Sequence, residues 1–438
     1  MARKRLASAL VACVLALVAG CGGGSSSSGT GGGGPTTVTL TFKGGAPTVV
    51  AARVGSGSFA AQALSSGTLS LSIPSGTTNF EVAYLCPPIT YLSAGAQSQL
   101  TEQFVFEATT ADGTSFSPTC PYTGFTGQTG TLFTGQTGTL MGSVDVSGIS
   151  GAAFYEVQAT NGTASTSTES SGPSGNFSFG APSGNDRVEV VAYGTVMQSN
   201  VATLMLFGAK NFNGQAVPGA LNGGSNVVLG AADSATQEPI TYNNIPSGYS
   251  APSTVVNFNL SGGGFLDALG STTQYPALPA GAVEPGDFYS FVATSFNPGA
   301  QAVGATLSSS TGGPVTFNFP SPWAYAGPTP AALPTLNFAY SGFSGDSGVV
   351  DSALLGWSAG TNALNTFTVM ATPNFLHGST GVTFPDLSSV PGFFQTLASG
   401  TQVTWSAEVV QDSYGVLQTM PSSSTGAFVE TDGIFTVP

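Results

Sequence analysis

The residues Gly67-Thr-Leu-Ser-Leu-Ser-Ile-Pro-Ser-Gly76 and Phe80-Glu-Val-Ala-Tyr84 indicate which kind of fold this chain adopts. They recur 108 residues later as Gly175-Asn-Phe-Ser-Phe-Gly-Ala-Pro-Ser-Gly184 and Val188-Glu-Val-Val-Ala-Tyr193, with the same spacing of glycine, proline and glutamate. In both copies apolar and polar residues alternate, as in a half-buried strand, and Pro-x-Gly is typical of a tight turn. The repeat therefore predicts two β-hairpins.

A fainter third copy reads Pro279-Ala-Gly281 ahead of Phe288–Val292. The hairpin resembles the one in small transthyretin-like or carboxypeptidase-regulatory-like sandwich modules, and the resemblance covers only part of each copy. It implies a β-sandwich fold and implies nothing about activity, because one fold can serve many functions.

Short strand patterns continue along the chain, separated by clusters of Gly, Pro, Ser and Asn. In the C-terminal part they predict six or seven strands, over Leu333–Tyr340, Val349–Trp357, Asn365–Ala371, Gly381–Phe384, Thr401–Val410 and Ala427–Val437. A strand that ends in Trp357 and a later strand that carries Trp405 make this part similar to a fibronectin type III domain. The tyrosine that this family carries before its sixth strand is absent here.

The chain opens with a secretory leader. Basic residues at positions 3–5 precede an apolar run, Leu6–Ala19, which is shorter than the roughly 20 residues that a membrane-spanning helix needs. The run ends in Val18-Ala-Gly-Cys21, which resembles the bacterial lipobox, where the cysteine is acylated and becomes the first residue. The alternative is an ordinary signal peptide that happens to end at a cysteine. The resemblance implies that Cys21 carries a lipid anchor.

A flexible tether follows the leader. Gly22-Gly-Gly24 and a Ser/Gly stretch up to Pro35 have the composition of a flexible coil. Several acyl chains on one residue hold a protein stably on a bilayer, whereas a single chain does not. Gly22 stands where many lipoproteins have an aspartate that resembles an inner-membrane retention signal. The sequence therefore favours lipid anchoring at the outer membrane, on its periplasmic or cell-surface face.

Together these patterns predict an all-β chain with three or four tandem β-sandwich domains, immunoglobulin-like or fibronectin III-like, after a lipoprotein signal peptide and a flexible tether. An identical repeat, Phe125–Leu132 and Phe133–Leu140, favours a duplicated linker between the first two sandwiches. The expected parts are a signal peptide (1–20), a lipidated Gly/Ser tether (21–35), sandwich 1 (36–122), the duplicated Gly/Thr linker (123–140), sandwich 2 (141–232), a linker (233–252), sandwich 3 (253–332) and a fibronectin III-like sandwich 4 (333–438).

Charge excludes two classes of partner. Beyond the leader, four basic residues stand against 21 acidic ones, so the net charge is close to −17. Four scattered cations cannot form a nucleic-acid interface or dock the protein on anionic lipid head groups. Only 6% of residues are charged and 41% are hydrophobic, which is the opposite of a disordered chain.

Cys86 and Cys120 are the cysteines left for the exported part, because Cys13 leaves with the leader and Cys21 takes the lipid. An even pair in an oxidising compartment favours a disulfide. A metal site would need more soft ligands, and the chain has a single histidine, His377. We therefore predict a Cys86–Cys120 disulfide and no bound metal or cofactor.

Two motifs resemble catalytic segments. Gly356-Trp-Ser-Ala-Gly360 matches the G-x-S-x-G pattern, which needs a strand, a sharp turn and a helix, but Asn362–Thr372 has a strand pattern. His377 with Asp386 behind it also reverses that family's order of acid and histidine. Gly345-Asp-Ser-Gly348 resembles the serine-protease nucleophile segment but lacks the glycine that follows it there. We expect a strand that ends in a Gly-rich turn, a histidine on a surface loop, and no catalytic residues.

Trp323 and Tyr325 are the candidate ligand-binding residues. They lie in a proline-fixed segment, Pro320–Pro328, and rigid aromatic faces on loops hold sugars or partner surfaces in many proteins. The alternative is that both rings pack between the third and fourth modules.

The sequence therefore favours a non-catalytic lipoprotein that is anchored outside the cytoplasm and has a binding, adhesion or scaffolding role. Its expected partners are the lipid bilayer, through acylated Cys21, and a glycan or protein ligand. The alternative is a secreted hydrolase, for example a glycan-active one, that uses two carboxylates. Spacing alone does not pair the 21 acidic residues.

Overall fold

The computed structural model describes residues 35–93, 96–120, 137–161, 165–198, 201–261, 265–267, 273–299, 301–323, 325, 327–338, 340, 342–343, 349–360, 362–394, 397–412 and 423–438. Within them the chain is all-β, as predicted. The helical elements are η1 (Leu221–Gly224), η2 (Ala231–Asp233), η3 (Ala280–Ala282) and α2 (Pro373–Leu376). None of these is long and apolar enough to span a membrane. The predicted leader, Cys21, most of the predicted linker and Gly345–Gly348 lie outside the described residues.

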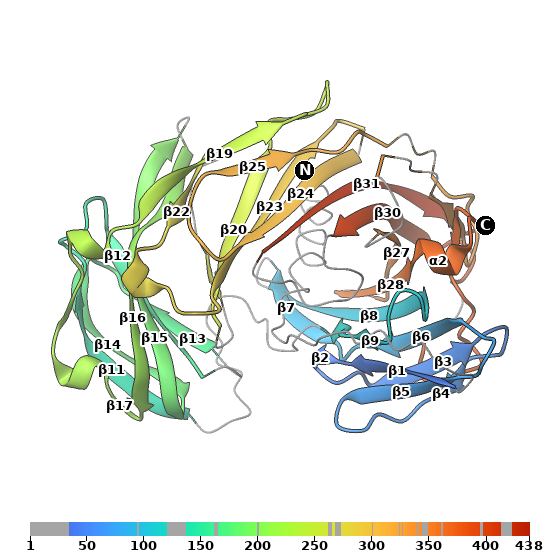
Figure 1. Cartoon of the computed structure of the whole chain (residues 1–438), viewed down its shortest axis with the longest axis horizontal. Helices are drawn as coiled ribbons and strands as arrows, with labels where there is room; N and C mark the ends of the chain where they lie inside the picture. Colours follow the sequence, from blue (N-terminus) through green and yellow to red (C-terminus); the bar gives the residue numbers. More distant parts are fainter. Residues whose placement is uncertain are drawn as a thin grey trace.

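Two sheets form the first sandwich (Figure 1). One has the strand order β5-β1-β9, and the other is the β4-β3-β6-β8 end of a much longer sheet. The strands are β1 (Thr36–Thr41), β2 (Lys43–Gly44), β3 (Val49–Val54), β4 (Ala60–Ala61), β5 (Thr68–Ile73), β6 (Asn79–Leu85), β7 (Ile89–Ser93), β8 (Ala96–Thr109), β9 (Ser115–Phe116) and β10 (Thr119–Cys120). The core between the sheets is rich in aromatic rings, and Phe80, Phe106 and Phe116 lie with centroids 5.0 to 6.2 Å apart.

The second sandwich has the same topology as the first. Its sheets have the orders β14-β11-β17, with β18 also on β11, and β13-β12-β15-β16. The strands are β11 (Thr137–Asp145), β12 (Phe154–Thr160), β13 (Ser165–Glu169), β14 (Ser174–Pro182), β15 (Gly184–Gln198), β16 (Val201–Val217), β17 (Gly219–Ala220) and β18 (Val227–Val228). Even the short parallel pair β1–β9 has a counterpart, in β11–β17. The repeat in the sequence therefore marks two copies of one sandwich.

The repeat does not form hairpins, and that prediction is wrong. β5 pairs with β1, whereas β6 pairs with β3 and β8, so the turn at Gly76 joins two sheets. The second copy does the same with β14 and β15, and the third copy with β22 and β23. Leu71 on β5 and Val82 on β6 enter one core from opposite sides. A turn that joins strands of two sheets (an arch) and a hairpin within one sheet require the same alternation of apolar and polar residues, so the sequence cannot distinguish them.

The remaining strands build the rest of the long sheet and its covers. They are β19 (Thr236–Asn243), β20 (Ser253–Asn259), β21 (Phe265–Asp267), β22 (Gln274–Ala277), β23 (Phe288–Phe296), β24 (Gln301–Ser309), β25 (Val315–Asn318), β26 (Thr335–Asn337), β27 (Val349–Ser358), β28 (Ala363–Ala371), β29 (Gly381–Thr383), β30 (Gln402–Asp412) and β31 (Ser424–Thr436). All six strands predicted for the C-terminal part are present, as β26 to β31. The segment expected as a linker, 233–252, contains β19, whose Ile240 is buried.

One 13-stranded sheet joins three of the predicted sandwiches. Its order is β21-β20-β23-β24-β31-β30-β27-β28-β8-β6-β3-β4, with β7 also on β8. β24 pairs with β31 across the expected boundary at residue 332, and β28 pairs in parallel with β8 of the first sandwich. Figure 1 shows the C-terminal strands in red and orange continuing into the cyan β8. These parts of the chain therefore share a sheet.

The two faces of the long sheet differ. One face, here called the core face, carries buried apolar side chains such as Val303, Ala353 and Val429, and the β22-β19-β25 and β26-β29 sheets contribute to the same core. The other face is covered by β5-β1-β9 at its β8 end. On β30 and β31 it carries Glu408 and Glu430, and this part is here called the acidic face.

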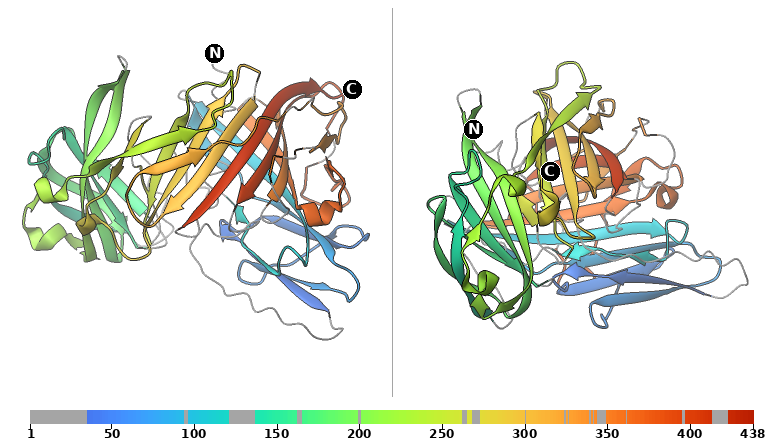
Figure 2. Two further views of the ribbon diagram at one scale, coloured as in Figure 1. Left: turned by 45° about the horizontal axis from the view of Figure 1, so that its top comes forward. Right: turned by 60° about the vertical axis from the view of Figure 1, so that its left-hand side comes forward.

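A buried ion-pair network joins the second sandwich to the long sheet. Figure 2 shows the green strands of this sandwich beside the yellow ones. Arg187 on β15 donates through Nη1 and Nη2 to the two carboxylate oxygens of Asp287, at 2.7 and 2.8 Å. Its Nη2 also donates to Glu189 at 2.6 Å. The backbone amides of Ser261 and Glu284 donate to Asp287. These contacts fix the start of β23 against β15.

Candidate ligand-binding site

Trp323 and Tyr325 lie in a segment that packs against the core face of the long sheet. Trp323 is 4% exposed, and its ring stacks on Phe338 with centroids 5.6 Å apart. Gln301 Nε2 donates to the Trp323 carbonyl at 2.8 Å, and the backbone amide of Asn337 donates to the Tyr325 hydroxyl at 3.1 Å. The two rings therefore pack against neighbouring segments, and Trp323 has little surface left for a ligand.

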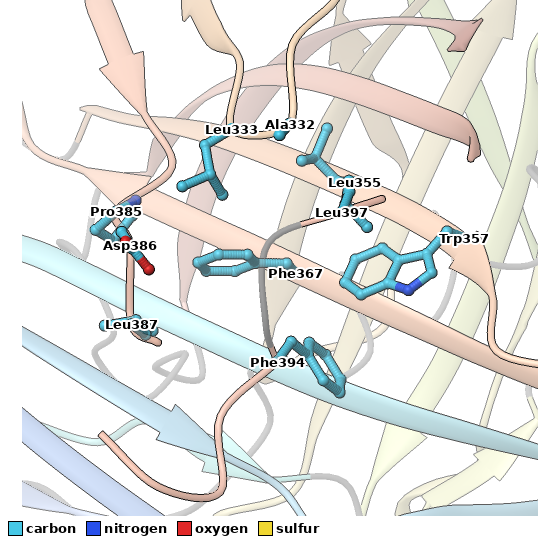
Figure 3. A pocket seen from close by; sticks show the side chains of 10 residues that line it. All are labelled: Ala332, Leu333, Leu355, Trp357, Phe367, Pro385, Asp386, Leu387, Phe394 and Leu397. Atoms are coloured by element: carbon cyan, nitrogen blue, oxygen red, sulfur yellow. The ribbon is translucent and has the colours of Figure 1, made fainter. Parts of the chain in front are cut away.

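An apolar pocket lies in the C-terminal part of the chain (Figure 3). Its lining consists of Ala332, Leu333, Leu355, Trp357, Phe367, Pro385, Asp386, Leu387, Phe394 and Leu397. Phe367 is buried at its floor, whereas Trp357 and Phe394 are half-buried. The space inside the hollow is about 10 Å³, enough for roughly one water-sized molecule, so it can take only a small apolar group of a ligand.

Local contacts hold the pocket in shape. Trp357, near the end of β27, meets Phe394 edge to face with centroids 5.1 Å apart. The backbone amide of Phe394 donates to Gln103 Oε1 at 2.8 Å, and Gln103 is completely buried on β8. Gln103 also lies directly opposite Phe367 in the β8–β28 pairing. The first sandwich therefore contributes to the support of a pocket in the C-terminal part.

Asp386 is the only ionisable residue in this lining, and it is exposed. Its carboxylate accepts a hydrogen bond from the backbone amide of Ser388 at 2.9 Å. Hydrogen bonding by Ser388 lowers the pKa of Asp386, so the carboxylate is ionised at neutral pH. The pocket thus combines an apolar interior with one negative charge, in a chain that is acidic throughout.

The sequence alone did not reveal this pocket. In the sequence Trp357 is only the end of a fibronectin III-like strand and part of Gly356–Gly360, and the other lining residues come from separate segments between Ala332 and Leu397. Ser358 ends β27, its hydroxyl donates to the Gly360 carbonyl at 2.8 Å, and β28 follows instead of a helix. The expected strand and Gly-rich turn are therefore present. His377 is exposed just after α2, with a left-handed backbone (φ 48°).

Two carboxyl groups face each other on the acidic face. Glu408 on β30 lies directly opposite Glu430 on β31, and both side chains are buried. Ser406 Oγ donates to Glu430 at 2.8 Å. Burial and the proximity of Glu430 raise the pKa of Glu408 to about 8, and burial raises the pKa of Glu430 to about 7. Neither residue lines the pocket of Figure 3.

The predicted disulfide is present. Cys86, just after β6, is bonded to Cys120 on β10, with the Cα atoms 5.4 Å apart, and both residues are completely buried. Among the described residues, no three His, Cys, Asp or Glu side chains lie together so that they could hold a metal ion.

Comparisons with known proteins add little to this description. No protein-family model and no curated protein matches the chain. Among solved structures, the Bacillus anthracis TIE protein is similar at 9% sequence identity with a TM-score of 0.12. The match covers 92% of this chain and 66% of that one, so the chain spans about two thirds of the length of that protein.

Proposed function

We propose that this protein is a lipid-anchored binding protein outside the cytoplasm, which holds a protein partner through the pocket around Trp357 and Phe394. The observation that carries this proposal is the composition of the pocket: half-buried aromatic side chains around an apolar floor, with the ionised Asp386 among its lining residues. Such a small site suits a small apolar side chain that is followed or preceded by a lysine or arginine. A non-catalytic role in adhesion or scaffolding fits this pocket, since a single acid does not supply an acid and a base.

Anchoring gives the first prediction. A Cys21→Ser variant is expected to lose its incorporated fatty acid and to move from the membrane fraction to the soluble fraction, because the thiol that accepts the lipid is missing. Radiolabelled palmitate and membrane fractionation measure both effects. A Cys13→Ser variant is the matched control and is expected to stay in the membrane fraction. Membrane retention of Cys21→Ser would contradict the anchor.

Binding at the pocket gives the second prediction. The full chain is applied to an array of short peptides that contain Ala, Val or Leu, half of them with a neighbouring Lys or Arg and half without. Trp357→Ala is expected to weaken the best peptides about tenfold or more, because truncating a central aromatic residue costs roughly 2 kcal/mol. Asp386→Asn is expected to weaken only the basic peptides.

Phe296→Ala is the control for this experiment, because it removes a 38% exposed aromatic side chain from another strand, β23. It is expected to leave binding unchanged. Equal losses for Trp357→Ala and Phe296→Ala, or binding of glycans and not of peptides on a parallel array, would overturn the proposed partner.

A carboxylate-based hydrolase is the second candidate, and the facing pair Glu408 and Glu430 favours it. Against it, both side chains are buried and the pocket of Figure 3 lies elsewhere. Hydrolysis of a glycan substrate that disappears in Glu408→Gln would favour this candidate over the binding protein.

A further inference from the structure

Eight carboxyl side chains are buried within the described residues, in a chain with few cations. They are Glu81, Glu107, Asp186, Glu189, Asp287, Asp351, Glu408 and Glu430. Arg53 pairs with Glu81, and Arg187 pairs with Glu189 and Asp287. In the described part of the chain, no ion pair reaches the other five. An ionised carboxylate that is buried without a cation is strongly disfavoured.

Two pairs of these acids lie directly opposite each other on neighbouring antiparallel strands. Glu408 faces Glu430, with Asp432 farther along β31 and Asp412 on its own strand, and its neighbour on β27 is the uncharged Ser352. All the charged neighbours are therefore acidic. Like charges directly opposite in a sheet repel, and burial strengthens the repulsion.

The second pair is Glu81 on β6 and Glu107 on β8. Arg53 on β3 reaches Glu81 from the far side, and the residue opposite Glu107 on β28 is Ala371. One guanidinium thus lies beside two buried carboxyls. It can balance one negative charge and leaves the other without a cation.

At two of these acids, hydrogen bonding does not compensate for the missing cation. Within the described residues, Glu408 Oε1 and both carboxylate oxygens of Asp186 are buried without a hydrogen-bond partner. A neutral carboxyl group tolerates such a position far better than an anion does.

We propose that the folded protein keeps several of these carboxyl groups protonated, so that the chain takes up protons as it folds and is most stable in acidic surroundings. The pH dependence is a property of the long sheet itself, because one opposed pair of acids lies between β30 and β31 and the other lies between β6 and β8. If the chain is exported as proposed above, it meets the pH of its surroundings directly. The stability measurement below does not depend on export.

The pKa values set the pH range of the effect. Burial raises the pKa of Glu107 and Glu408 to about 8 and that of Asp351 and Glu430 to about 7. Unfolded carboxyl groups titrate near pH 4, so between about pH 5 and 8 the folded state binds more protons than the unfolded state. Stability must therefore fall as the pH rises through this window.

The third prediction follows. Urea unfolding of the full chain is expected to show a midpoint that is clearly higher at pH 5 than at pH 8. Each group that titrates only in the folded state changes the unfolding equilibrium constant by up to about tenfold per pH unit. The infrared band of protonated carboxyl groups is expected in the folded protein at pH 6.5 and not in the urea-unfolded protein. A midpoint that stays level or rises from pH 5 to pH 8 overturns the proposal, as does the absence of that band.

Single variants assign the effect to a pair. Glu408→Gln keeps the shape of the side chain and cannot ionise, so it is expected to raise the midpoint at pH 8, to leave it nearly unchanged at pH 5 and to flatten the slope between them. Glu107→Gln tests the second pair in the same way. Glu169→Gln on β13 is the control, because Glu169 is exposed. The assignment to the buried pairs is contradicted if neither variant flattens the slope of the urea midpoint against pH. It is also contradicted if Glu169→Gln flattens this slope equally.

Discussion

Replacement of Arg187 by alanine is expected to lower the free energy of unfolding by about 3 to 5 kcal/mol, which is the usual cost of removing one partner from a buried ion pair. Arg187 is 8% exposed and lies between two buried acids, Glu189 and Asp287. Without the guanidinium, both carboxyl groups stay buried and lose their cation. Urea unfolding of the purified chain at pH 7 measures the loss.

The two acids are expected to respond differently. Burial raises the pKa of Asp287, but hydrogen bonds from Arg187 and from the backbone amides of Glu284 and Ser261 lower it more, so its pKa lies below the usual value. Burial raises the pKa of Glu189 to about 8 even beside Arg187. At pH 7 Glu189 is therefore expected to be neutral already in the wild type and to stay neutral in the variant, whereas Asp287 loses its cation and keeps only two backbone donors. The contact between β15 and the start of β23 should loosen first.

Arg53→Ala is the matched control. Arg53 also pairs with a buried glutamate, Glu81, but its own side chain is 30% exposed. An ion pair that is partly open to solvent contributes less, so the expected loss is about 1 kcal/mol. Arg187→Lys keeps the charge but cannot donate to Asp287 through two parallel hydrogen bonds, and it should recover only part of the stability. Equal losses for Arg187→Ala and Arg53→Ala would show that Arg187 does not join the two parts of the molecule.

The strands could be predicted from the sequence, but the way they assemble could not. The alternation of apolar and polar residues is a local property of the sequence, and it predicted all six C-terminal strands. Pairing is not local: β8 and β28 are more than 250 residues apart in the chain and pair in parallel. The repeat gave two strands and a turn for each copy, and the alternation that it shows fits an arch as well as a hairpin. The duplicated topology becomes visible only when the sheets are compared.

The candidate site shows the same limit. Trp323 and Tyr325 are aromatic and lie among prolines, which is typical of a binding loop, but in the fold the Trp323 ring packs on Phe338. The pocket around Trp357 draws its lining from five segments between Ala332 and Leu397. The opposed acids depend on the register of two long strands, since a shift of one residue would place Glu408 and Glu430 on different faces. The disulfide could be predicted because only two cysteines remained to be paired.

Removal of that disulfide is expected to have the other large effect. In the chain-entropy model, a bond that closes a loop of about 35 residues stabilises the folded state by roughly 4 kcal/mol. Cys86→Ala with Cys120→Ala is therefore expected to lower the free energy of unfolding by about this amount. Both side chains are buried in the core of the first sandwich, so alanine also leaves small cavities that add to the loss.

The structure also indicates which strand should be the first to lose stability when the disulfide is removed. Cys120 lies on β10, which pairs with β2 over only two residues, and Cys86 follows directly after β6 of the long sheet. Without the bond, β10 has little else to hold it, whereas the buried ring of Phe116 still anchors β9 in the aromatic core, so amide hydrogen exchange should rise in β10 before it rises in β6. A reducing agent should lower the stability of the wild-type chain and leave the double variant unchanged. A double variant within 1 kcal/mol of the wild type would mean that the sandwich is held by its aromatic core alone, and that the chain entropy removed by the bond is not what stabilises this end of the sheet.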